Sequence, residues 1–253
     1  MYAEERQQQI ASQARALGRV DVAELALAFD VSVETVRRDL TALEREGVLR
    51  RVHGGAIPVD RLRQEPALVA RSTVRTAEKE RIAKAALAEL GGATTVLLDA
   101  GSTTALLADL LPVDRDLTVV TNALPIAVAL SARPSTTVLV VGGRVRPRTM
   151  ACVDATALDQ LAELHVDVAF LGANGVSVGR GLTTADPAEA AVKRAMVACA
   201  RRAVVLADRS KVGDDQFARF AALEDVETLV TDADLDPREA AALEAAGPKV
   251  VLA

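Results

Sequence analysis

Residues 99–104, Asp-Ala-Gly-Ser-Thr-Thr, join an apolar segment to a helix-forming one. Backbone N–H groups at a helix start, with the positive end of the helix dipole, favour an anion such as phosphate. Gly101 opens this turn, and the hydroxyls of Ser102, Thr103 and Thr104 add donors at the same place. No Gly-Lys-Ser/Thr follows, so this is not a Walker A loop, and no GxGxxG opens the unit. A plain helix N-cap without a ligand is the alternative.

Further polar residues follow other predicted strands. Ligands of parallel α/β sheets bind beyond the carboxyl ends of the strands, and carboxylates there suit sugar hydroxyls. The chain has only five lysines, and two of them, Lys193 and Lys211, lie near this zone. Glu189 and Lys193 are four residues apart, so a surface helix pair of about 0.3–0.5 kcal/mol is the alternative interpretation. The residues at or just after strand ends are Asn122, Gly142, Gly143, Gly172, Asn174, Gly175, Asp186, Glu189 and Asp208.

A different chemistry is indicated by VSVETVRRDL, residues 31–40. It places Arg37 and Arg38 early in a predicted helix of a chain whose net charge is −5. An arginine can donate two hydrogen bonds to guanine O6 and N7 in the major groove, and a threonine can contact a phosphate or a thymine methyl. From residue 37 to 53, five arginines stand against three acids. A solvated helix face is the alternative for an isolated arginine pair.

Three helices and a hairpin must position these arginines. Apolar spacing predicts helices over residues 4–17, 22–29 and 33–46, with Asp21 and Ser32 as N-caps. The segment 48–58, VLRRVHGGAIP, alternates around two glycines and predicts a small β-hairpin or wing. This order is that of a winged helix-turn-helix DNA-binding domain. The expected DNA-contacting residues are Ser32, Glu34, Thr35, Arg37, Arg38, Thr41, Arg50, Arg51 and His53.

The predicted recognition helix has one apolar stripe, formed by Val33, Val36, Leu40 and Leu43. With this stripe turned inward, the polar side chains face out. On the wing, Arg50 and Arg51 are assigned to phosphates, where their contribution falls steeply with salt. A three-helix protein–protein module is the alternative, but it leaves the wing tip and the outward arginines unexplained.

We expect a DNA-binding domain over residues 1–58, a linker over 59–75 and an effector domain over 76–253. The linker segment has prolines, many charges and no sustained period, with short structure around Leu68-Val69. From Thr76 onward, Val/Leu segments alternate with amphipathic helices, which predicts an α/β fold with a parallel sheet covered on both faces. The predicted strands are residues 94–100, 117–122, 136–143, 166–175, 202–208, 228–232 and 249–253.

Residues 19–57, RVDVAELALAFDVSVETVRRDLTALEREGVLRRVHGGAI, resemble the N-terminal signature of the DeoR/GlpR family of bacterial transcriptional regulators. The family's members are mostly repressors of sugar-catabolism operons. The resemblance implies that Ser32, Thr35, Arg37 and Arg38 contact the operator.

The likeness continues from about residue 75 to 235. LLDAGSTT, VVTNALPIA, VLVVGG, VDVAFLGANGVS, GLTTADPAEAAVKRAM and VVLADRSKVG are similar to the family's effector domain, whose fold resembles ribose-phosphate isomerase. The resemblance implies that Gly101, Ser102, Thr103 and Thr104 hold a phosphate, and that Asp99, Asn122, Asn174, Lys193 and Lys211 complete the pocket, to which we add Gly143 and Glu189. The start MYAEERQQ and GLTTADPAEAAVKRAM look most like actinobacterial members associated with fructose utilisation, which favours a fructose phosphate. Related sequences usually have Gly at the position of Asp154, so a pocket wall is expected to differ there.

The same resemblance separates a sensor from an enzyme. Related isomerases carry Asp-Gly-Ala-Asp at the end of the fourth strand, and this chain has Leu171-Gly172-Ala173-Asn174. An amide cannot act as the general base that an isomerase needs. We therefore expect a repressor without a cofactor, controlled by a phosphorylated sugar. An isomerase-like enzyme with Asp186 or Glu189 as a displaced base, and an activator of the same architecture, are the alternatives.

Composition limits the partners. The acidic excess, 35 acids against 30 basic residues, gives no global argument for nucleic acid, so DNA affinity must come from a local patch. Cys152 and Cys199 lack metal-ligand spacing, which favours reduced thiols in the cytoplasm. No apolar segment approaches the ~20 residues of a membrane span, and the first residues lack the apolar stretch of a secretory signal. One DNA-binding domain contacts few bases, so we expect a homo-oligomer, a dimer or a tetramer.

Overall fold

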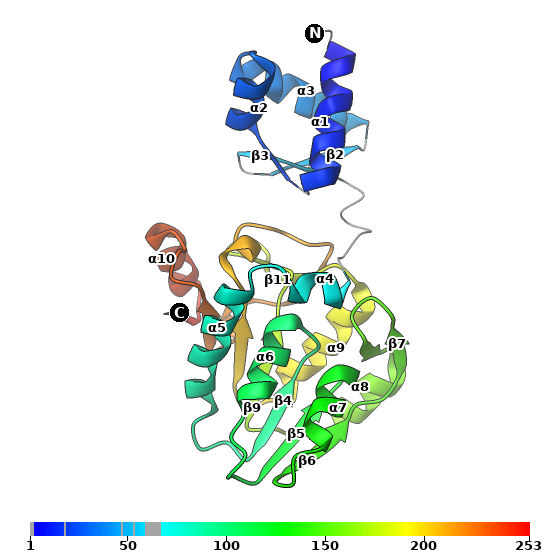
Figure 1. Ribbon diagram of the computed structural model, residues 1–253, viewed down its shortest axis with the longest axis vertical. Helices are drawn as coiled ribbons and strands as arrows, with labels where there is room; N and C mark the ends of the chain where they lie inside the picture. Colours follow the sequence, from blue (N-terminus) through cyan, green and yellow to red (C-terminus); the bar gives the residue numbers. More distant parts are fainter. Residues whose placement is uncertain (1–2, 18, 47, 53, 59–66) are drawn as a thin grey trace. The chain divides into compact units, whose positions relative to one another are not determined.

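The computed structural model describes residues 3–17, 19–46, 48–52, 54–58 and 67–253 (Figure 1). The chain divides into two compact units, Met1–Glu65 and Pro66–Ala253. Of the predicted linker, residues 59–66 lie outside the described part. Residues 67–75 belong to the second unit, where Leu68–Ser72 form the short helix α4. The expected limits of the domains stay a prediction.

The first unit is a winged helix-turn-helix, as predicted. Its three-stranded antiparallel sheet has the order β1-β3-β2, so the hairpin pairs with an additional short strand, β1. Gly55 lies opposite this strand, and a Cβ there would come 2.0 Å from the Val20 carbonyl oxygen, so only glycine fits. The elements are α1 (Ala3–Leu17), β1 (Val20–Asp21), α2 (Val22–Phe29), α3 (Val33–Arg45), β2 (Leu49–Val52) and β3 (Gly55–Pro58).

Local interactions set the turn between α2 and α3. Asp21 caps α2 by accepting the N–H of Ala23 at 2.7 Å, and Asp30 ends α2 in the left-handed region at φ 50°. Ser32 then caps α3 by accepting the N–H of Thr35 at 3.1 Å. The predicted apolar stripe of α3 is wrong at Val33, which is 40% exposed, because the first turn extends beyond the buried cluster.

The second unit contains a seven-stranded sheet whose neighbouring strands are all parallel. All seven predicted strands are confirmed, and the strand order is β15-β14-β12-β9-β4-β5-β6. The order reverses direction around β4 and β9, so the loops after these strands diverge, which is where open α/β sheets bind ligands. The strands are β4 (Thr95–Leu98), β5 (Leu117–Thr121), β6 (Thr136–Val140), β9 (Val168–Gly172), β12 (Ala203–Leu206), β14 (Thr228–Thr231) and β15 (Lys249–Leu252).

Helices cover both faces of this sheet, as the Val/Leu-rich strands predict (Figure 1). Leu97 packs into one hydrophobic cluster, whereas its neighbours Val96 and Leu98 pack into the other, because successive side chains of a strand point to opposite faces. The cluster around Val96 includes residues of α5 (Thr76–Leu87), α6 (Ser102–Leu110) and α7 (Leu124–Ser131), and the cluster around Leu97 includes residues of α8 (Ala155–Ala162), α9 (Pro187–Ala198) and α10 (Pro237–Ala245).

Within the described residues 67–253, two smaller sheets and three short 3-10 helices were not predicted. The predicted strand 166–175 ends at Gly172, and the chain turns at Asn174 into a three-stranded antiparallel sheet. No helix in the described ranges is both long and apolar enough to cross a membrane. The additional elements are η2 (Ala88–Leu90), β7 (Arg144–Arg146), β8 (Ala151–Val153), β10 (Gly175–Ser177), β11 (Gly181–Thr184), η3 (Arg209–Lys211), β13 (Ala218–Ala221) and η4 (Leu223–Asp225).

Candidate functional site

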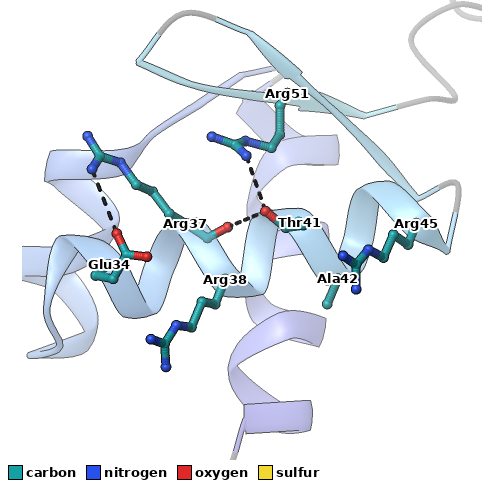
Figure 2. Close-up of a pocket in the computed structure, with 7 residues that line it drawn as sticks. All are labelled: Glu34, Arg37, Arg38, Thr41, Ala42, Arg45 and Arg51. Carbon is teal, nitrogen blue, oxygen red and sulfur yellow. Dashed lines mark hydrogen bonds and ion pairs between the residues drawn. The ribbon is translucent and has the colours of Figure 1, made fainter.

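The outer face of α3 and the wing strand β2 enclose a surface depression of about 430 Å³ (Figure 2). Six of its lining residues repeat every three or four positions along α3, which places them on one face of the helix. Arg51 of β2 lies over the same face. The lining residues are Glu34, Arg37, Arg38, Thr41, Ala42, Arg45 and Arg51.

These arginines differ in whether a neighbouring side chain pairs with them. Arg37 lies 3.8 Å from Glu34, with both side chains more than half exposed, so this pair is weak in water. Arg38 and Arg45 are exposed, and within the described ranges neither has an ion-pair or hydrogen-bond partner. Figure 2 shows the Arg38 side chain extending away from the helix. Sequence reasoning counted Arg45 in the local charge but omitted it from the site, although it lies seven residues after Arg38.

A fourth arginine connects the wing to the recognition helix. The backbone N–H of Arg51 donates to the Glu44 carboxylate at 2.9 Å, and its guanidinium donates to the Thr41 hydroxyl at 3.2 Å. That hydroxyl in turn donates to the Arg37 carbonyl at 2.8 Å. These contacts hold β2 beside the middle of α3. The side chain of Arg50 and all of His53 lie outside the described residues.

Fewer acidic side chains are exposed on α3 than the sequence indicates. Asp39 is buried and accepts from Arg6 of α1, with Arg6 Nε 2.6 Å from Asp39 Oδ2 and Nη2 3.2 Å from Oδ1. Gln7 donates to the same carboxylate at 3.0 Å. The hydrogen bond to Asp39 raises the pKa of the Arg6 guanidinium. Since Asp39 is neutralised inside the unit, it does not offset the exposed arginines.

Two other expected DNA-contacting residues form the cap of α3. The hydroxyls of Ser32 and Thr35 lie 2.8 Å apart, and Ser32 also accepts the Thr35 N–H. Ser32 is exposed and Thr35 is half-buried. Both residues therefore stabilise the N-terminus of α3. Their hydroxyls keep further hydrogen-bonding capacity at this end of the helix.

In the second unit, Asp99 after β4 and Lys193 of α9 form a buried ion pair. Asp99 also accepts the Gly172 N–H at 3.1 Å, and Lys193 donates to the Gly172 carbonyl at 3.0 Å. Burial raises the pKa of the Asp99 carboxyl, which the charge of Lys193 opposes. The ends of β4 and β9 and the middle of α9 are thus joined at one point.

The alternative interpretation, that Glu189 and Lys193 form an ion pair on the helix surface, is wrong. Both side chains are buried, and Glu189 accepts from the Arg146 guanidinium and the Thr149 hydroxyl instead. Arg146 also lies 3.4 Å from Asp186, the cap of α9. The helix spacing is as expected, but burial gives each charge a partner on another element. Arg146 and Thr149 were missed because nothing local in the sequence marks the β7–β8 hairpin as their position.

The three hydroxyls expected to bind an anion at the start of α6 have two different roles. Thr104 is fully buried, and its hydroxyl donates to the carbonyls of Asp99 at 2.7 Å and Gly101 at 3.0 Å, so it serves the turn itself. Within the described residues, the hydroxyls of Ser102 and Thr103 have no hydrogen-bond partner. The N–H groups of this first turn have no acceptor within the helix. Ser102 and Thr103 are therefore the hydroxyls that remain for an anion.

Asn122 lies beside Asp99 in the register of β5 against β4. Its side-chain nitrogen donates to the Cys152 carbonyl at 3.1 Å, and its buried Oδ1 has no hydrogen-bond partner in the described structure. The Cys152 carbonyl fixes the orientation of this amide, because the opposite orientation would place two oxygens together. Oδ1 is thus an acceptor that lacks a donor. Asn174, by contrast, already accepts from the Thr184 hydroxyl at 2.9 Å.

Backbone geometry explains two other positions. At Gly143, φ is 140° and a Cβ would lie 2.3 Å from the Val153 carbonyl oxygen, so the β7–β8 pairing requires glycine there. Asp154 has φ 76° and ψ −168°, a conformation that is essentially restricted to glycine. Its side chain binds Arg144, with Arg144 Nε 2.6 Å from Asp154 Oδ2. This backbone conformation would suit the glycine that the family resemblance leads us to expect at this position.

The end of β12 carries a group of charges that includes Lys211. Asp208 is buried and accepts the Ser210 N–H at 3.0 Å, and Arg75 Nε lies 3.8 Å from it. Lys79 of α5 is also buried nearby, and burial lowers the pKa of its ammonium group. Sequence reasoning missed Lys79, although the same scarcity of lysine that marked Lys193 and Lys211 applies to it.

Neither cysteine nor acid clusters indicate a metal. Among the described residues, no three His, Cys, Asp or Glu side chains gather as metal ligands. Cys152 and Cys199 are buried free thiols, and burial raises the pKa of both.

Comparison with known proteins gives the same two-unit division. Residues 6–61 match the DeoR-like helix-turn-helix domain, and residues 74–233 match the DeoR C terminal sensor domain. The chain is 37% identical to an uncharacterized HTH-type transcriptional regulator, FruR, of Bacillus subtilis, over 92% of this chain and 93% of that protein. It is 31% identical to a putative aga operon transcriptional repressor of Escherichia coli O157:H7, over 98% and 93% of the two chains.

Among solved structures, ribose 5-phosphate isomerase A of Methanocaldococcus jannaschii aligns with 53% of this chain and 53% of its own. The TM-score is 0.39 and the sequence identity is 20%. The parallel sheet and the helices that cover it are established by the structure of this chain itself.

Proposed function

This chain belongs to the DeoR family of transcriptional regulators, and from that premise we propose that it represses a sugar-catabolism operon under the control of a phosphorylated sugar. The N-terminal unit binds operator DNA, and the C-terminal unit binds the effector. The observation that carries the DNA half is the pair of exposed, unpartnered arginines, Arg38 and Arg45, on the outer face of α3. An activator of the same architecture is the alternative.

At the operator, the first turns of α3 enter the major groove. Arg37 and Arg38 lie there, and Arg38 is available for a bidentate contact with guanine. Arg45 near the end of the helix, and Arg50, Arg51 and His53 on the wing, are assigned to the phosphate backbone. Thr35 and Thr41 lie on the same helix, and Glu34 lies 3.8 Å from Arg37 at the start of this face.

In the sensor unit, the phosphate binds at the start of α6, to the free N–H groups and to the hydroxyls of Ser102 and Thr103. Lys211 supplies a positive charge at the end of β12. Asn122 Oδ1 accepts a hydroxyl of the sugar, which is the donor that this buried oxygen lacks. A fructose phosphate is the preferred effector.

The site binds without catalysing isomerisation. Proton transfer between sugar carbons requires a free carboxylate of suitable basicity. Asn174 is an amide, Glu189 is bound by Arg146 and Thr149, and Asp186 caps α9 by accepting the N–H groups of Ala188 and Glu189. Each candidate base is thus engaged. Purified protein incubated with ribose 5-phosphate and fructose 6-phosphate should show no isomerisation; a measurable turnover would support the enzyme alternative.

We place the regulator in the cytoplasm as a homo-oligomer. Two α3 helices bound to repeated half-sites read enough base pairs for useful specificity, which one helix does not. Light scattering of the purified protein gives the oligomer number, with a dimer or a tetramer expected and a monomer contradicting this part.

DNA binding is tested with duplexes selected by the purified protein from a random pool. Their affinity is then measured by fluorescence anisotropy at 50 and 200 mM salt. A protein that neutralises several phosphates loses orders of magnitude in affinity over this range. The absence of binding even at the lower salt contradicts the repressor function.

The sensor half is tested by thermal unfolding in the presence of fructose 1-phosphate, fructose 6-phosphate and glycerol 3-phosphate, each beside its dephosphorylated counterpart. An effector at 100 times its Kd adds about 2.7 kcal/mol to the free energy of unfolding of the sensor unit, a shift of several degrees. A shift with the phosphate alone supports the site at α6. If neither these phosphates nor other sugar phosphates shift the transition, the sensor function is contradicted.

A further inference from the structure

The helix α4, which follows the DNA-binding unit in the chain, is attached to the second unit by few contacts. It has five residues and buries no side chain, and its Val69 is 78% exposed. A helix of this length is not stable by itself in water. Its position therefore depends on the polar contacts that the second unit makes with it.

Lys79 of α5 makes the principal contact. Its ammonium group is buried and donates to the Arg71 carbonyl and, at 2.7 Å, to the Val74 carbonyl. Arg71 lies in the last turn of α4 and Val74 in the turn that follows, and the Arg71 carbonyl also accepts the Val74 N–H at 3.4 Å. One side chain thus satisfies the end of α4 and connects it to α5.

Two further contacts hold the ends of this segment. At its start, the Leu68 N–H donates to the Arg148 carbonyl at 2.8 Å, in the turn between β7 and β8. After its end, Arg75 adopts φ 53°, and its Nε lies 3.8 Å from Asp208 at the end of β12. α4 also packs against α6, whose first turn is the proposed phosphate position. The segment 67–75 therefore contacts the β7–β8 turn, the end of β12 and α6, the helix whose first turn is the proposed phosphate position.

Three polar groups of that site, those of Asp99, Asn122 and Lys193, are closed to solvent, whereas Ser102 and Lys211 are partly exposed. Asp99 and Asn122 are 2% exposed and Lys193 is 4% exposed. A sugar phosphate can reach them only after a neighbouring element moves. α4 buries no side chain, so displacing it costs little free energy.

The charges around Lys79 favour an interaction between its ammonium group and a bound phosphate. The charges of Lys211, Arg71 and Arg75 act on Lys79 unfavourably, whereas that of Asp208 acts favourably. The charges that act on Lys79 are therefore mostly positive, and they are opposed by Asp208 and by Glu78, which lies 3.6 Å from Arg75. A phosphate bound near Lys211 would relieve this excess of positive charge, and it is a stronger acceptor for an ammonium group than a backbone carbonyl.

We propose that α4 is a movable cover of the effector site and that Lys79 holds it closed in the absence of ligand. A bound anion competes with the Arg71 and Val74 carbonyls for the Lys79 ammonium group, so α4 is released as the site fills. Because α4 is the first described element after the DNA-binding unit in the chain, its release changes how that unit is tethered. The ligand in this mechanism rests on the proposed function, whereas the attachment of α4 by Lys79 does not.

The attachment is tested without any ligand, by hydrogen exchange of residues 67–75 in the full chain. Lys79→Met removes the ammonium group and keeps an unbranched apolar stem. Exchange should accelerate about tenfold or more, the effect of losing hydrogen bonds from a charged donor. Lys84→Met is the matched control, since Lys84 is an exposed lysine on the same helix. Equal exchange in the wild type and both variants overturns the proposal.

A second pair of variants guards against misfolding of Lys79→Met. Leu68→Pro removes the leucine side chain and the N–H that binds Arg148 but keeps the helix, because proline is tolerated at the first position of a helix and Ala67 already has ψ 151°. Leu68→Ala removes the same side chain and keeps the N–H. Faster exchange over residues 69–75 in the proline variant than in the alanine variant supports a cover held by separate contacts, and equal exchange contradicts it.

The coupling is tested with fructose 1-phosphate as the probe and inorganic phosphate beside it. Wild-type protein with the sugar phosphate should show the fast exchange of Lys79→Met, and the variant should show no further change. A sugar phosphate that raises the unfolding temperature while residues 67–75 exchange as before overturns the cover and leaves the sensor standing. If no sugar phosphate raises it, the sensor function fails, and the comparison of the Lys79 and Lys84 variants still decides the attachment.

Discussion

Arg6 on α1 and Asp39 on α3 form a buried ion pair in the DNA-binding unit, with Arg6 Nε 2.6 Å from Asp39 Oδ2. Their side chains are only 10% and 5% exposed. Asp39 lies next to Arg38 in sequence but is buried whereas Arg38 is exposed, so the pair holds α3 against α1 while the arginines face outward. The orientation of the DNA-contacting face thus depends on an interaction inside the unit.

Replacing Asp39 with Asn should destabilise the DNA-binding unit strongly. Arg6 would remain charged and buried without its partner, a change that typically costs about 3–5 kcal/mol. Hydrogen exchange of α1 and α3 in the full chain measures the loss, and the affinity for selected DNA should fall with it. Glu46→Gln, an exposed acid at the end of the same helix, is the control. An Asp39→Asn protein as protected as this control would show that the pair contributes little.

Arg38 and Arg45 should lose DNA affinity in different ways when changed to Ala. Arg38→Ala is expected to cost about 1–3 kcal/mol of binding and to relax the preference at one base pair. Arg45→Ala should weaken all sequences alike and reduce the salt slope by about 1. Anisotropy titrations on selected and scrambled duplexes at several salt concentrations separate the two. Lys84→Ala in the other unit serves as control, and identical effects of the two arginine variants would contradict the assignment.

Asp167 should make the second unit sensitive to acid. The N–H groups of Thr95 and Thr94 donate to Asp167 Oδ2 at 3.0 and 2.9 Å and hold the pKa of this carboxyl well below its usual value. The folded state therefore binds this proton less readily than the unfolded state. The contribution of Asp167 is complete above the unfolded pKa of about 3.9 and is lost as the pH falls below that value.

The corresponding measurement is urea unfolding between pH 2.5 and 6 for the wild type, Asp167→Asn and Asp159→Asn. Stability of Asp167→Asn should depend less steeply on pH below about 4 than that of the wild type. Asp159 is an exposed residue of α8 without such donors, so its variant should follow the wild-type profile. Parallel profiles for all three proteins would show that Asp167 has no such role.

Asp154→Gly should stabilise the second unit by about 1 kcal/mol. The backbone at φ 76° and ψ −168° costs a non-glycine residue about 1–3 kcal/mol. Part of the gain is offset by the greater freedom of glycine in the unfolded chain and by the loss of the exposed ion pair with Arg144. Thermal unfolding measures the difference. Asp159→Gly, within α8, should give no gain, and a destabilised Asp154→Gly would mean that the Arg144 contact outweighs the strain.

The α/β class, the seven parallel strands and the winged helix-turn-helix follow from the sequence because their signals are local. Val/Leu segments with helices between them define buried strands, and Asp21 and Ser32 start their helices as predicted. The position of Val33 was wrong, since helical periodicity identifies a stripe and does not show how far along the helix the core extends. β1 was missed because two residues carry no strand pattern of their own.

The partners of the charged side chains were decided by the tertiary structure alone. Glu189 and Lys193 are neighbours on one helix, yet they bind Thr149 and Asp99, which lie 40 and 94 residues away in the chain. The sequence did not show that Asp39 is buried against Arg6 of α1. Nor did it show that Lys79 donates hydrogen bonds to carbonyls at the end of α4. Charged groups interact over a few ångströms in space, and burial removes the water that would otherwise screen them. Residue type and spacing therefore determined what the elements are and which chemistry they carry, whereas only the folded chain determined which of those groups are already paired and which remain for a ligand or DNA.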